Sequence, residues 1–395
     1  MIELTEHQST QLDRLLSMDV PVRALRGLAG TGKTSVIPHI VRRLGDVEVT
    51  APTNRAALIL RNKGLTAAKT LFKACMRPRF DDDYTSYSLW LSNPERPLPK
   101  LLEGRDKAEI KAKLDVESAS REEKDAALGI NAMDHVVGWN ARDRGDEGAK
   151  YVIIDESSMI DEKLLFEAQR AYEYVILVGD PGQLPPVKGT PVLREAEGVD
   201  LVDVHRQAED SPILRYAYAV RDARSGKIPP LLPGIESAKV YDPGRGPILV
   251  YRNATRKALN IGMRNKLKYP RWELQKGEPL ICKATSRKWQ ELGLLNNSLW
   301  TYQGGNRVVN ELGEFRTVPK MYVEDMTQGD PDPTACQFYL GYAMTTHSAQ
   351  GSEFDSVQIA LSDVIHAQSQ GDDFWRQLMY TMVTRAKNKL WVVQL

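Results

Sequence analysis

The sequence has few cysteines, no long hydrophobic run and almost no net charge. Cys75, Cys282 and Cys336 are the three cysteines among 395 residues. Their wide spacing fits neither a zinc site nor the disulfide framework of a small secreted protein. No apolar stretch approaches the ~20 residues that a membrane helix needs, and the first ten residues are polar rather than typical of a signal peptide. We therefore expect a cytoplasmic protein with no membrane partner.

The composition is that of a globular protein of more than one domain. Hydrophobic residues make up 42% of the chain and charged residues 27%, which excludes a disordered or fibrous protein. At about 150 residues per domain, the length predicts two or three domains. The 53 Lys and Arg balance 52 Asp and Glu. This balance leaves nucleic-acid binding open, because acidic faces can offset a basic groove.

Short apolar runs alternate with helical patterns in both halves of the chain, which predicts an α/β fold with a parallel sheet in each half. Residues 35–44 show the clearest helical pattern, with one apolar face and Gly45 at its end. The expected strands cover residues 22–26, 47–50, 151–154 and 174–178 in the first half, and 248–251, 357–361 and 390–393 in the second.

Two segments interrupt this alternation. Residues 77–150 are crowded with charges of both signs, and within them residues 105–124 have helical spacing, so we expect a solvated helical insertion. Residues 272–333 contain short strand-like pieces separated by Asn and Gly. This pattern predicts a small antiparallel barrel or sheet inserted in the second half.

Residues 27–34, Gly-Leu-Ala-Gly-Thr-Gly-Lys-Thr, satisfy the P-loop pattern and open the predicted helix. The glycines let backbone amides converge on phosphate oxygens, and the helix N-terminus adds partial positive charge. Lys33 can reach the β and γ phosphates, and the Thr34 hydroxyl can bind Mg²⁺. Gly27, Gly30, Thr31 and Gly32 complete the predicted phosphate site.

A second apolar strand delivers two carboxylates, Asp155 and Glu156. Asp155 can hold the metal, and Glu156 is placed to orient and deprotonate an attacking water. Paired acids alone are a moderate signal, but both this pair and the P-loop follow predicted parallel strands. Ligands of such sheets bind outside the carboxyl ends of the strands. The sequence therefore predicts one Mg-ATP site.

Several further segments give the chain a resemblance to a known family. They are residues 4–8 (LTEHQ), 51–57 (APTNRAA), 155–159 (DESSM), 179–187 (GDPGQLPPV), 205–207 (HRQ), 342–355 (YAMTTHSAQGSEFD) and 380–386 (YTMVTRA). Their order and spacing are similar to those of superfamily 1 helicases, and the third and fourth resemble the RecD/Dda-like group, superfamily 1B. The resemblance implies two RecA-like P-loop domains and 5′ to 3′ movement on DNA.

The resemblance also implies roles for single residues. Gln8 would read adenine, Gln183 would report the γ-phosphate, and Gly351 and Glu353 would touch sugar and phosphates. Arg206 and Arg385 would stabilise the charge of the transferring phosphoryl group when the lobes close. Outside its motif, either arginine would be read as an ordinary surface or ion-pair residue. The residues implied to contact a single strand are Pro52, Thr53, Asn54, Phe72, Thr345, Thr346 and His347.

Two of these strand contacts have plain structural alternatives. Phe72 stands where the family commonly has histidine, so it either stacks on a base or fills core. His347 is either a strand contact or a buried hydrogen-bonding group.

The expected organisation is a domain 1A at residues 1–76 and 150–198, and a domain 2A at 199–271 and 334–395. Insertion 1B, at 77–149, would carry the wedge, and an SH3-like insertion 2B would span 272–333. The expected function is that of an ATP-dependent DNA helicase in replication, repair or recombination, in a bacterial or phage-infected cell. Its substrates would be single-stranded DNA and forked or tailed duplex. It would act as a monomer, with single-strand-binding or replication proteins as further candidate partners.

Three alternatives stay open at this point. The same ATP-driven protein could act on RNA, because contacts to the DNA and RNA backbones are similar unless the protein binds the 2′-hydroxyl. It could also translocate without strong unwinding. A module that binds nucleic acid without catalysis is the third, although intact Lys33, Thr34, Asp155 and Glu156 count against it.

Overall fold

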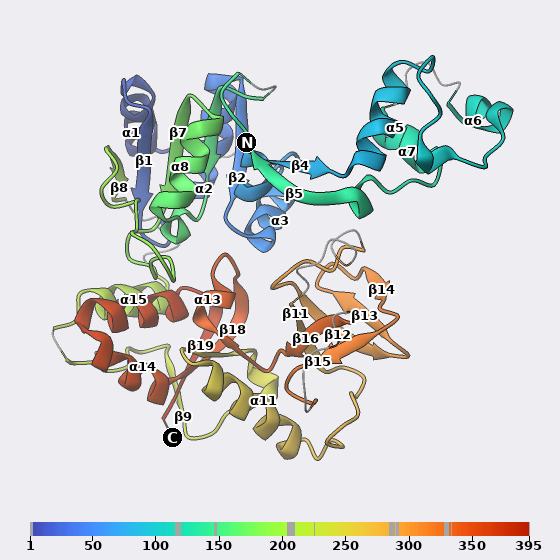
Figure 1. Ribbon diagram of the computed structural model, residues 1–395. Coiled ribbons are helices and arrows are strands. Elements are labelled where there is room, and N and C mark those ends of the chain that lie inside the picture. The colour runs from blue at the N-terminus through green and yellow to red at the C-terminus, as the bar shows by residue number, and fades with distance from the viewer. Residues whose placement is uncertain are drawn as a thin grey trace. The chain divides into compact units, whose positions relative to one another are not determined.

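The computed structural model describes residues 3–114, 120–145, 148–203, 210–224, 226–283, 289, 292–327, 332 and 334–394 (Figure 1). The chain forms two compact units, a small one over Cys75–Asp143 and a large one that contains the remaining residues. Within the described ranges, no helix combines the length and the apolar composition that crossing a bilayer requires.

The first sheet of the large unit is entirely parallel, and its strand order is β3-β2-β6-β7-β1-β8 among the described residues. β6 and β7 lie in its middle and are buried along almost their whole length, which explains their continuous apolar sequences. The strands are β1 (Val22–Gly27), β2 (Val47–Ala51), β3 (Lys69–Thr70), β6 (Tyr151–Ile154), β7 (Tyr174–Gly179) and β8 (Gly198–Leu201).

Helices with one apolar face cover this sheet, and we call the sheet with its helices lobe 1. Leu12, Ile37 and Leu60 from three helices pack with Ile153 and Ile176 of the sheet in one core. Thr5 and Gln8 form a capping box that fixes the start of α1. The helices are α1 (Glu6–Ser17), α2 (Lys33–Leu44), α3 (Asn54–Asn62), α4 (Leu71–Cys75) and α8 (Glu162–Ala171), with a 3₁₀ turn η3 (Ser157–Met159).

The second sheet is also parallel, with the described strand order β17-β10-β18-β19-β9. Trp375 and Tyr380 of α15 are fully buried in its core, and we call this sheet with its helices lobe 2. The strands are β9 (Glu236–Ala238), β10 (Ile248–Val250), β17 (Ala343–Thr345), β18 (Phe354–Ala360) and β19 (Ala386–Val393). The helices are α10 (Pro212–Arg221), α11 (Asn253–Lys266), α13 (Thr346–Ala349), α14 (Leu361–Ala367) and α15 (Asp372–Val383), with 3₁₀ turns η4 (Pro243–Arg245) and η5 (Gln368–Gln370).

The third sheet is small, and in the described part of the chain its order is β14-β13-β12-β11-β16-β15. Its pairs are antiparallel except β15 with β16. The strands are β11 (Pro279–Cys282), β12 (Leu299–Gly304), β13 (Arg307–Asn310), β14 (Phe315–Thr317), β15 (Met321–Val323) and β16 (Cys336–Leu340). Only Gly341 and Tyr342 separate β16 from β17 of the second sheet.

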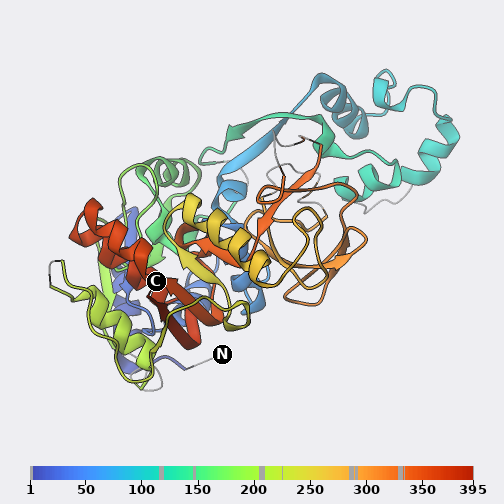
Figure 2. The ribbon, with the colours of Figure 1, turned by 90° about the horizontal axis from the view of Figure 1, so that it is seen from below.

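The small unit is a two-stranded ribbon that carries helices. β4 (Met76–Phe80) and β5 (Val136–Ala141) pair antiparallel, and both views show the helices at one end of this ribbon (Figures 1 and 2). Tyr84, Tyr87 and Leu128 belong to its own apolar core. The helices are α5 (Asp82–Ser92), α6 (Lys107–Leu114) and α7 (Arg121–Ala127), with 3₁₀ turns η1 (Lys100–Leu102) and η2 (Ala132–His135).

The predicted α/β class with two parallel sheets and a small β insertion is confirmed. The helical pattern of residues 105–124 is present as α6 and α7. The ribbon strands β4 and β5 were not predicted. β4 alternates apolar residues with arginines around Pro78, and its partner lies about 60 residues away, so no local pattern reveals the pair.

The side chain of Asn260 links lobe 2 to the third sheet. Its amide nitrogen donates to Asp325 at 3.0 Å and to the Leu340 carbonyl at 2.7 Å. Its amide oxygen accepts from the Ala343 backbone N–H at 2.7 Å. Asn260 is fully buried, so these groups have no access to water when their partner is removed.

We therefore expect Asn260→Ala to lower the free energy of unfolding by about 2–4 kcal/mol, because buried polar groups lose their partner. Urea unfolding followed by circular dichroism measures this change. Asn265→Ala is the matched control, since Asn265 lies on the exposed face of the same helix. Equal stability of the two variants would contradict the bridging role of Asn260.

Candidate nucleotide and strand-binding site

The P-loop connects β1 to α2 in the geometry that binds phosphate. Gly30 and Gly32 have φ angles of 86° and 76°, the left-handed region that favours glycine. A Cβ on Gly27 would lie 2.4 Å from Thr31 Oγ1, so this position also requires glycine. Lys33 Nζ donates to the Leu28 carbonyl at 2.9 Å, which holds the amine within the loop. The loop therefore presents amides and a lysine to one small volume.

The two predicted carboxylates stand beside the P-loop. The Thr34 hydroxyl donates to Asp155 Oδ2 at 3.5 Å. Burial, followed by the negative charge of Glu156, raises the pKa of Asp155 to about 6. Glu156 has a φ of 54°, an uncommon conformation for a residue with a side chain. Such strained residues concentrate at functional sites, and this one is the second residue after β6.

The residues fit a magnesium ion in the way that P-loop proteins bind it. Mg²⁺ prefers a few oxygen ligands and keeps several waters, and Thr34 and Asp155 supply a hydroxyl and a carboxylate side by side. Among the described residues, no cluster of three or more His, Cys, Asp or Glu could hold a metal by itself. A metal at this place would thus be held jointly by the protein, water and phosphate.

Both glutamines predicted for the site are buried. Gln8 is buried, and its amide nitrogen donates to the Thr31 carbonyl at 3.1 Å. Gln183 is also buried, and its side-chain oxygen has no hydrogen-bond partner among the described residues. A buried acceptor without a partner is costly, so the Gln183 oxygen can accept a hydrogen bond from a donor that the described residues do not supply.

The P-loop is bonded directly to lobe 2. The Ala29 N–H donates to the Tyr380 hydroxyl at 3.0 Å, and the Tyr218 hydroxyl donates to the Ala29 carbonyl at 2.6 Å. Tyr380 in turn donates to Asp180 at 2.8 Å. Burial raises the pKa of Tyr380 well above its usual range, so the phenol keeps its proton. Sequence reasoning gave neither tyrosine a role, and Tyr218 lies outside every motif.

The segment after β7 is also bonded to lobe 2. The Leu184 N–H donates to the Thr381 hydroxyl at 2.9 Å, and the Gln350 side chain donates to the Leu184 carbonyl at 3.1 Å. A Cβ on Gly182 would lie 3.0 Å from the Tyr380 ring, so glycine permits this close packing. Gln183 thus lies in a segment that both lobes hold.

Of the two predicted arginines, the structure describes one. Arg206 lies outside the described residues. Arg385 is buried, and its guanidinium donates to the carbonyls of Ser352 at 3.1 Å and Thr381 at 3.2 Å, both in lobe 2. The structure thus brings Lys33, Thr34 and the acids together, while Arg385 is bonded within its own lobe.

The predicted strand contact Thr53 of lobe 1 adjoins Gly351 of lobe 2, which was predicted to touch the nucleotide. Thr53 caps α3, and its hydroxyl accepts from the Ala56 N–H at 3.1 Å. A Cβ on Gly351, which has a φ of 69°, would lie 3.0 Å from Ala56 Cβ and 3.6 Å from Thr53 Oγ1. Pro52 and Asn54 flank Thr53 at the carboxyl end of β2.

The remaining predicted contacts are placed unequally. Thr345 caps α13 next to Ser348, whereas Thr346 is fully buried and its hydroxyl donates to the Val250 carbonyl at 2.9 Å. In this structure the Thr346 hydroxyl therefore stabilises lobe 2 internally and is not presented to a strand. Burial lowers the pKa of His347, which keeps its ring neutral at pH 7. Phe72 is 45% exposed, and Glu353 pairs with Lys387 at 3.3 Å.

Arg55, which sequence reasoning passed over, also joins the lobes. Its guanidinium donates to both carboxylate oxygens of Glu311 in the loop after β13, at 3.1 and 3.2 Å. It also lies 5.5 Å from the centre of the Phe354 ring. Arg55 directly follows the predicted contact Asn54 in the chain, and that neighbourhood is the signal that could have drawn attention to it.

The raised pKa of Asp155 predicts how stability depends on pH. The folded protein holds a proton that the unfolded chain, with a pKa near 3.8, releases earlier. Stability is therefore lost as pH rises through about 4 to 6, by at most about 3 kcal/mol. We expect Asp155→Asn to raise the melting temperature by a few degrees at pH 8 and to change it little at pH 3, below both pKa values. Calorimetry at both pH values measures this, and equal shifts would contradict it.

Comparisons with known proteins agree with this geometry. Residues 3–232 match the family described as an AAA domain, and residues 340–393 match the UvrD-like helicase C-terminal domain. The ATP-dependent RecD2 DNA helicase of Deinococcus radiodurans is 27% identical in an alignment 272 residues long, and the alignment covers 60% of this chain and 35% of that protein. The chain thus spans about a third of the length of this curated relative.

Solved structures share the fold over nearly the whole chain. A Pif1 structure that addresses unwinding of forked duplex DNA by two coordinating helicases has a TM-score of 0.57 and 18% identity, and covers 99% of this chain and 92% of that one. Bacteroides Pif1 bound to single-stranded DNA has a TM-score of 0.55 and 16% identity, with the same coverage. Because the AAA-domain match covers more than half of its residues, the chain belongs to this family, within the RecD/Pif1-like superfamily 1B helicases.

Proposed function

We propose that this protein is an ATP-dependent DNA helicase that moves 5′ to 3′ on single-stranded DNA and unwinds duplex. The observation that carries the proposal is the bonding of the P-loop residue Ala29 to Tyr380 and Tyr218 of lobe 2. A nucleotide bound at the P-loop would alter this peptide and thereby the junction between the lobes. Nucleotide state and lobe position are then coupled, as a motor requires.

The relatives support the choice of DNA. The Deinococcus relative is named as an ATP-dependent DNA helicase, and Bacteroides Pif1 was solved with single-stranded DNA. In this chain, Thr53 of lobe 1 and Gly351 of lobe 2 adjoin, which is what a strand crossing both lobes needs. Thr53, Asn54 and Thr345 would bind the backbone through hydroxyl and amide groups without reading sequence.

Each residue of the site has a role in ATP hydrolysis. Lys33 and the P-loop amides bind the β and γ phosphates. Thr34 and Asp155 hold Mg²⁺, which when bound neutralises charge that develops on the phosphate oxygens. Glu156 orients the attacking water and accepts its proton. The side-chain oxygen of Gln183 accepts a hydrogen bond from a donor in the closed site.

Arg385 would complete the site from lobe 2. When the lobes close around ATP, its guanidinium would exchange the carbonyls of Ser352 and Thr381 for γ-phosphate oxygens. Arg206 would approach from the same lobe. Opening after hydrolysis would return Arg385 to its carbonyls, so that each cycle changes the grip on the strand.

The domain assignment follows the same logic. Residues 1–76 and 150–198 would form 1A, residues 199–271 and 334–395 would form 2A, and 272–333 would form 2B. Insertion 77–149 would carry the wedge that separates base pairs, each costing about 1.4 kcal/mol to unstack. We further propose that the protein acts as a cytoplasmic monomer on forked or tailed duplex, with single-strand-binding or replication proteins as partners.

A helicase assay with tailed duplexes tests the proposal. We expect ATP-dependent unwinding of duplex with a 5′ tail, and ATPase activity that single-stranded DNA stimulates more than RNA. Lys33→Ala and Glu156→Gln should each lower the ATPase rate by at least about 100-fold, because they remove phosphate binding and the general base.

Arg42→Ala, on the exposed end of the P-loop helix, is the control and should leave the rate unchanged. A preference for 3′ tails would overturn the direction. Stronger stimulation by RNA would contradict DNA as the substrate. ATPase activity that survives both Lys33→Ala and Glu156→Gln would contradict the assignment of the ATPase site.

The tyrosine contact gives a separate prediction. Tyr380→Phe removes the acceptor of the Ala29 N–H and the donor to Asp180. We expect the stimulation of ATPase by single-stranded DNA to fall about five- to tenfold, the worth of one such bond. The strand-independent rate should change by less than about twofold.

Tyr216→Phe is the matched control, since Tyr216 is a buried tyrosine of lobe 2 whose hydroxyl bonds the Pro229 carbonyl within the same lobe. Steady-state ATPase assays with and without a strand measure both variants. Identical behaviour of the two would refute a coupling role for Tyr380.

A further inference from the structure

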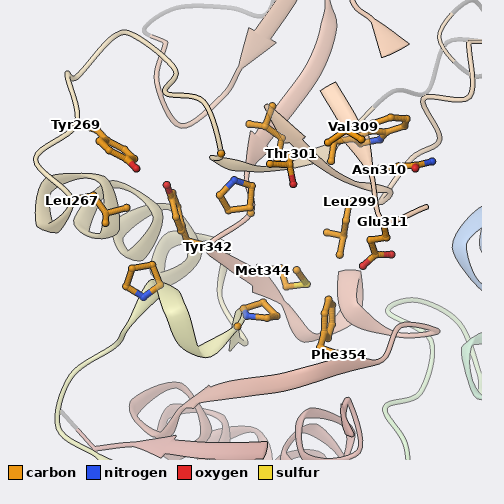
Figure 3. Close-up of a pocket in the computed structure, with 18 residues that line it drawn as sticks. Leu267, Tyr269, Leu299, Thr301, Val309, Asn310, Glu311, Tyr342, Met344 and Phe354 are labelled. Atoms are coloured by element: carbon orange, nitrogen blue, oxygen red, sulfur yellow. The ribbon is translucent and has the colours of Figure 1, made fainter. Parts of the chain in front are cut away.

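A pocket of about 500 Å³ lies where the second sheet meets the third (Figure 3). Glu311 and Phe354 lie at one end of it and Leu267 and Tyr269 at the other, with Met344 between them. The volume falls in the range of small-molecule sites, which are typically apolar and aromatic with a few polar groups. The hydrolysis and strand contacts proposed above do not use this pocket.

The lining selects against a charged ligand. Among the described residues that line the pocket, Glu311 is the only charged one, and none of them is cationic. Arg55 already pairs with Glu311 at the entrance, so a phosphate or other anion would find no counter-ion deeper in this lining. Tyr342, Trp300 and Phe354 instead supply aromatic surface, which suits an uncharged planar ring.

Polar recognition inside the pocket is adaptable. Thr301 lies opposite Val309 in the β12–β13 pair, and both line the pocket. A threonine hydroxyl both donates and accepts hydrogen bonds, so it can pair with the edge of any nucleobase. The Asn310 side-chain oxygen instead accepts hydrogen bonds from the Leu312 and Glu314 N–H groups of the turn that follows β13.

The end of the pocket at Glu311 and Phe354 adjoins the proposed strand path. Arg55 bonds Glu311 and lies over the Phe354 ring, and it follows Asn54 directly. Gly351, which adjoins Thr53, stands three residues before Phe354. A strand held at Thr53 and Asn54 would therefore pass the entrance.

We propose that this pocket takes one nucleobase of the bound strand. This inference rests on the proposed function. The base enters past Phe354, lies against the aromatic wall and meets the Thr301 hydroxyl. The phosphates stay outside, because the apolar lining offers them no counter-ion. Because every base offers a flat face and a polar edge, the pocket anchors the strand without regard to sequence.

An abasic scan tests this proposal with the unaltered protein. Short oligonucleotides of mixed sequence carry one abasic sugar at successive positions, and fluorescence anisotropy without nucleotide measures their affinity. We expect one position at which the missing base weakens binding at least fivefold, in line with the measured worth of stacking a base on an aromatic side chain. The loss should be similar for purines and pyrimidines.

A variant that fills the pocket connects this position to the structure. Val309→Trp places a large ring inside the pocket, whereas the control Leu312→Trp alters an exposed residue of the same loop region that does not line it. We expect Val309→Trp to bind all oligonucleotides with the affinity of the abasic one, so that the sensitive position disappears. Leu312→Trp should retain it. Quenching of 2-aminopurine at that position should be lost in Val309→Trp alone.

The outcomes separate this inference from the proposed function. A flat abasic scan, with strand-stimulated ATPase intact, would overturn the pocket and leave the helicase standing. A sensitive position that persists in Val309→Trp, with 2-aminopurine still quenched, would place the base elsewhere and equally overturn it. Loss of stimulation by any strand in the unaltered protein would instead count against the helicase.

Discussion

The hydrogen bonds between the P-loop and lobe 2 are the constraint on which the rest of the structure depends. Ala29 uses both its N–H and its carbonyl to bond Tyr380 and Tyr218. A loop that must curl around phosphates is thus fixed at one peptide by the other lobe. When the conformation of the loop changes, lobe 2 must either move with it or lose these hydrogen bonds. Each bond contributes only about 1 kcal/mol, so either outcome is energetically accessible.

The site itself is held in an unfavourable state that the cores around it stabilise. Asp155 is a buried acid next to a second acid, and Glu156 adopts a left-handed conformation that costs about 1–2 kcal/mol. Gln183 keeps a buried acceptor without a partner among the described residues. A bound cation would offset the first of these, because it favours the charged form of the Asp155 carboxylate.

Sequence reasoning succeeded where the signal is local. Buried parallel strands such as Tyr151–Ile154 are apolar throughout, and the P-loop is a contiguous pattern, so both could be predicted. It failed where partners are distant. Tyr218 is 189 residues from Ala29 and Arg55 is 256 from Glu311, and only the folded chain shows these pairs. The resemblance also could not tell that Thr346, beside Thr345, turns inward to Val250.

The short link between β16 and β17 has a consequence for protein engineering. Two residues join the third sheet to the second, and a Cβ on Gly341 would meet the Pro279 backbone at 3.1 Å. Asn260 crosses the same seam. The third sheet therefore cannot be exchanged by itself. A chimaera that exchanges this sheet for that of a homologue must also take helix α11 and Gly341 from the homologue. Otherwise the backbone groups that Asn260 bonds would lose their hydrogen-bond partner.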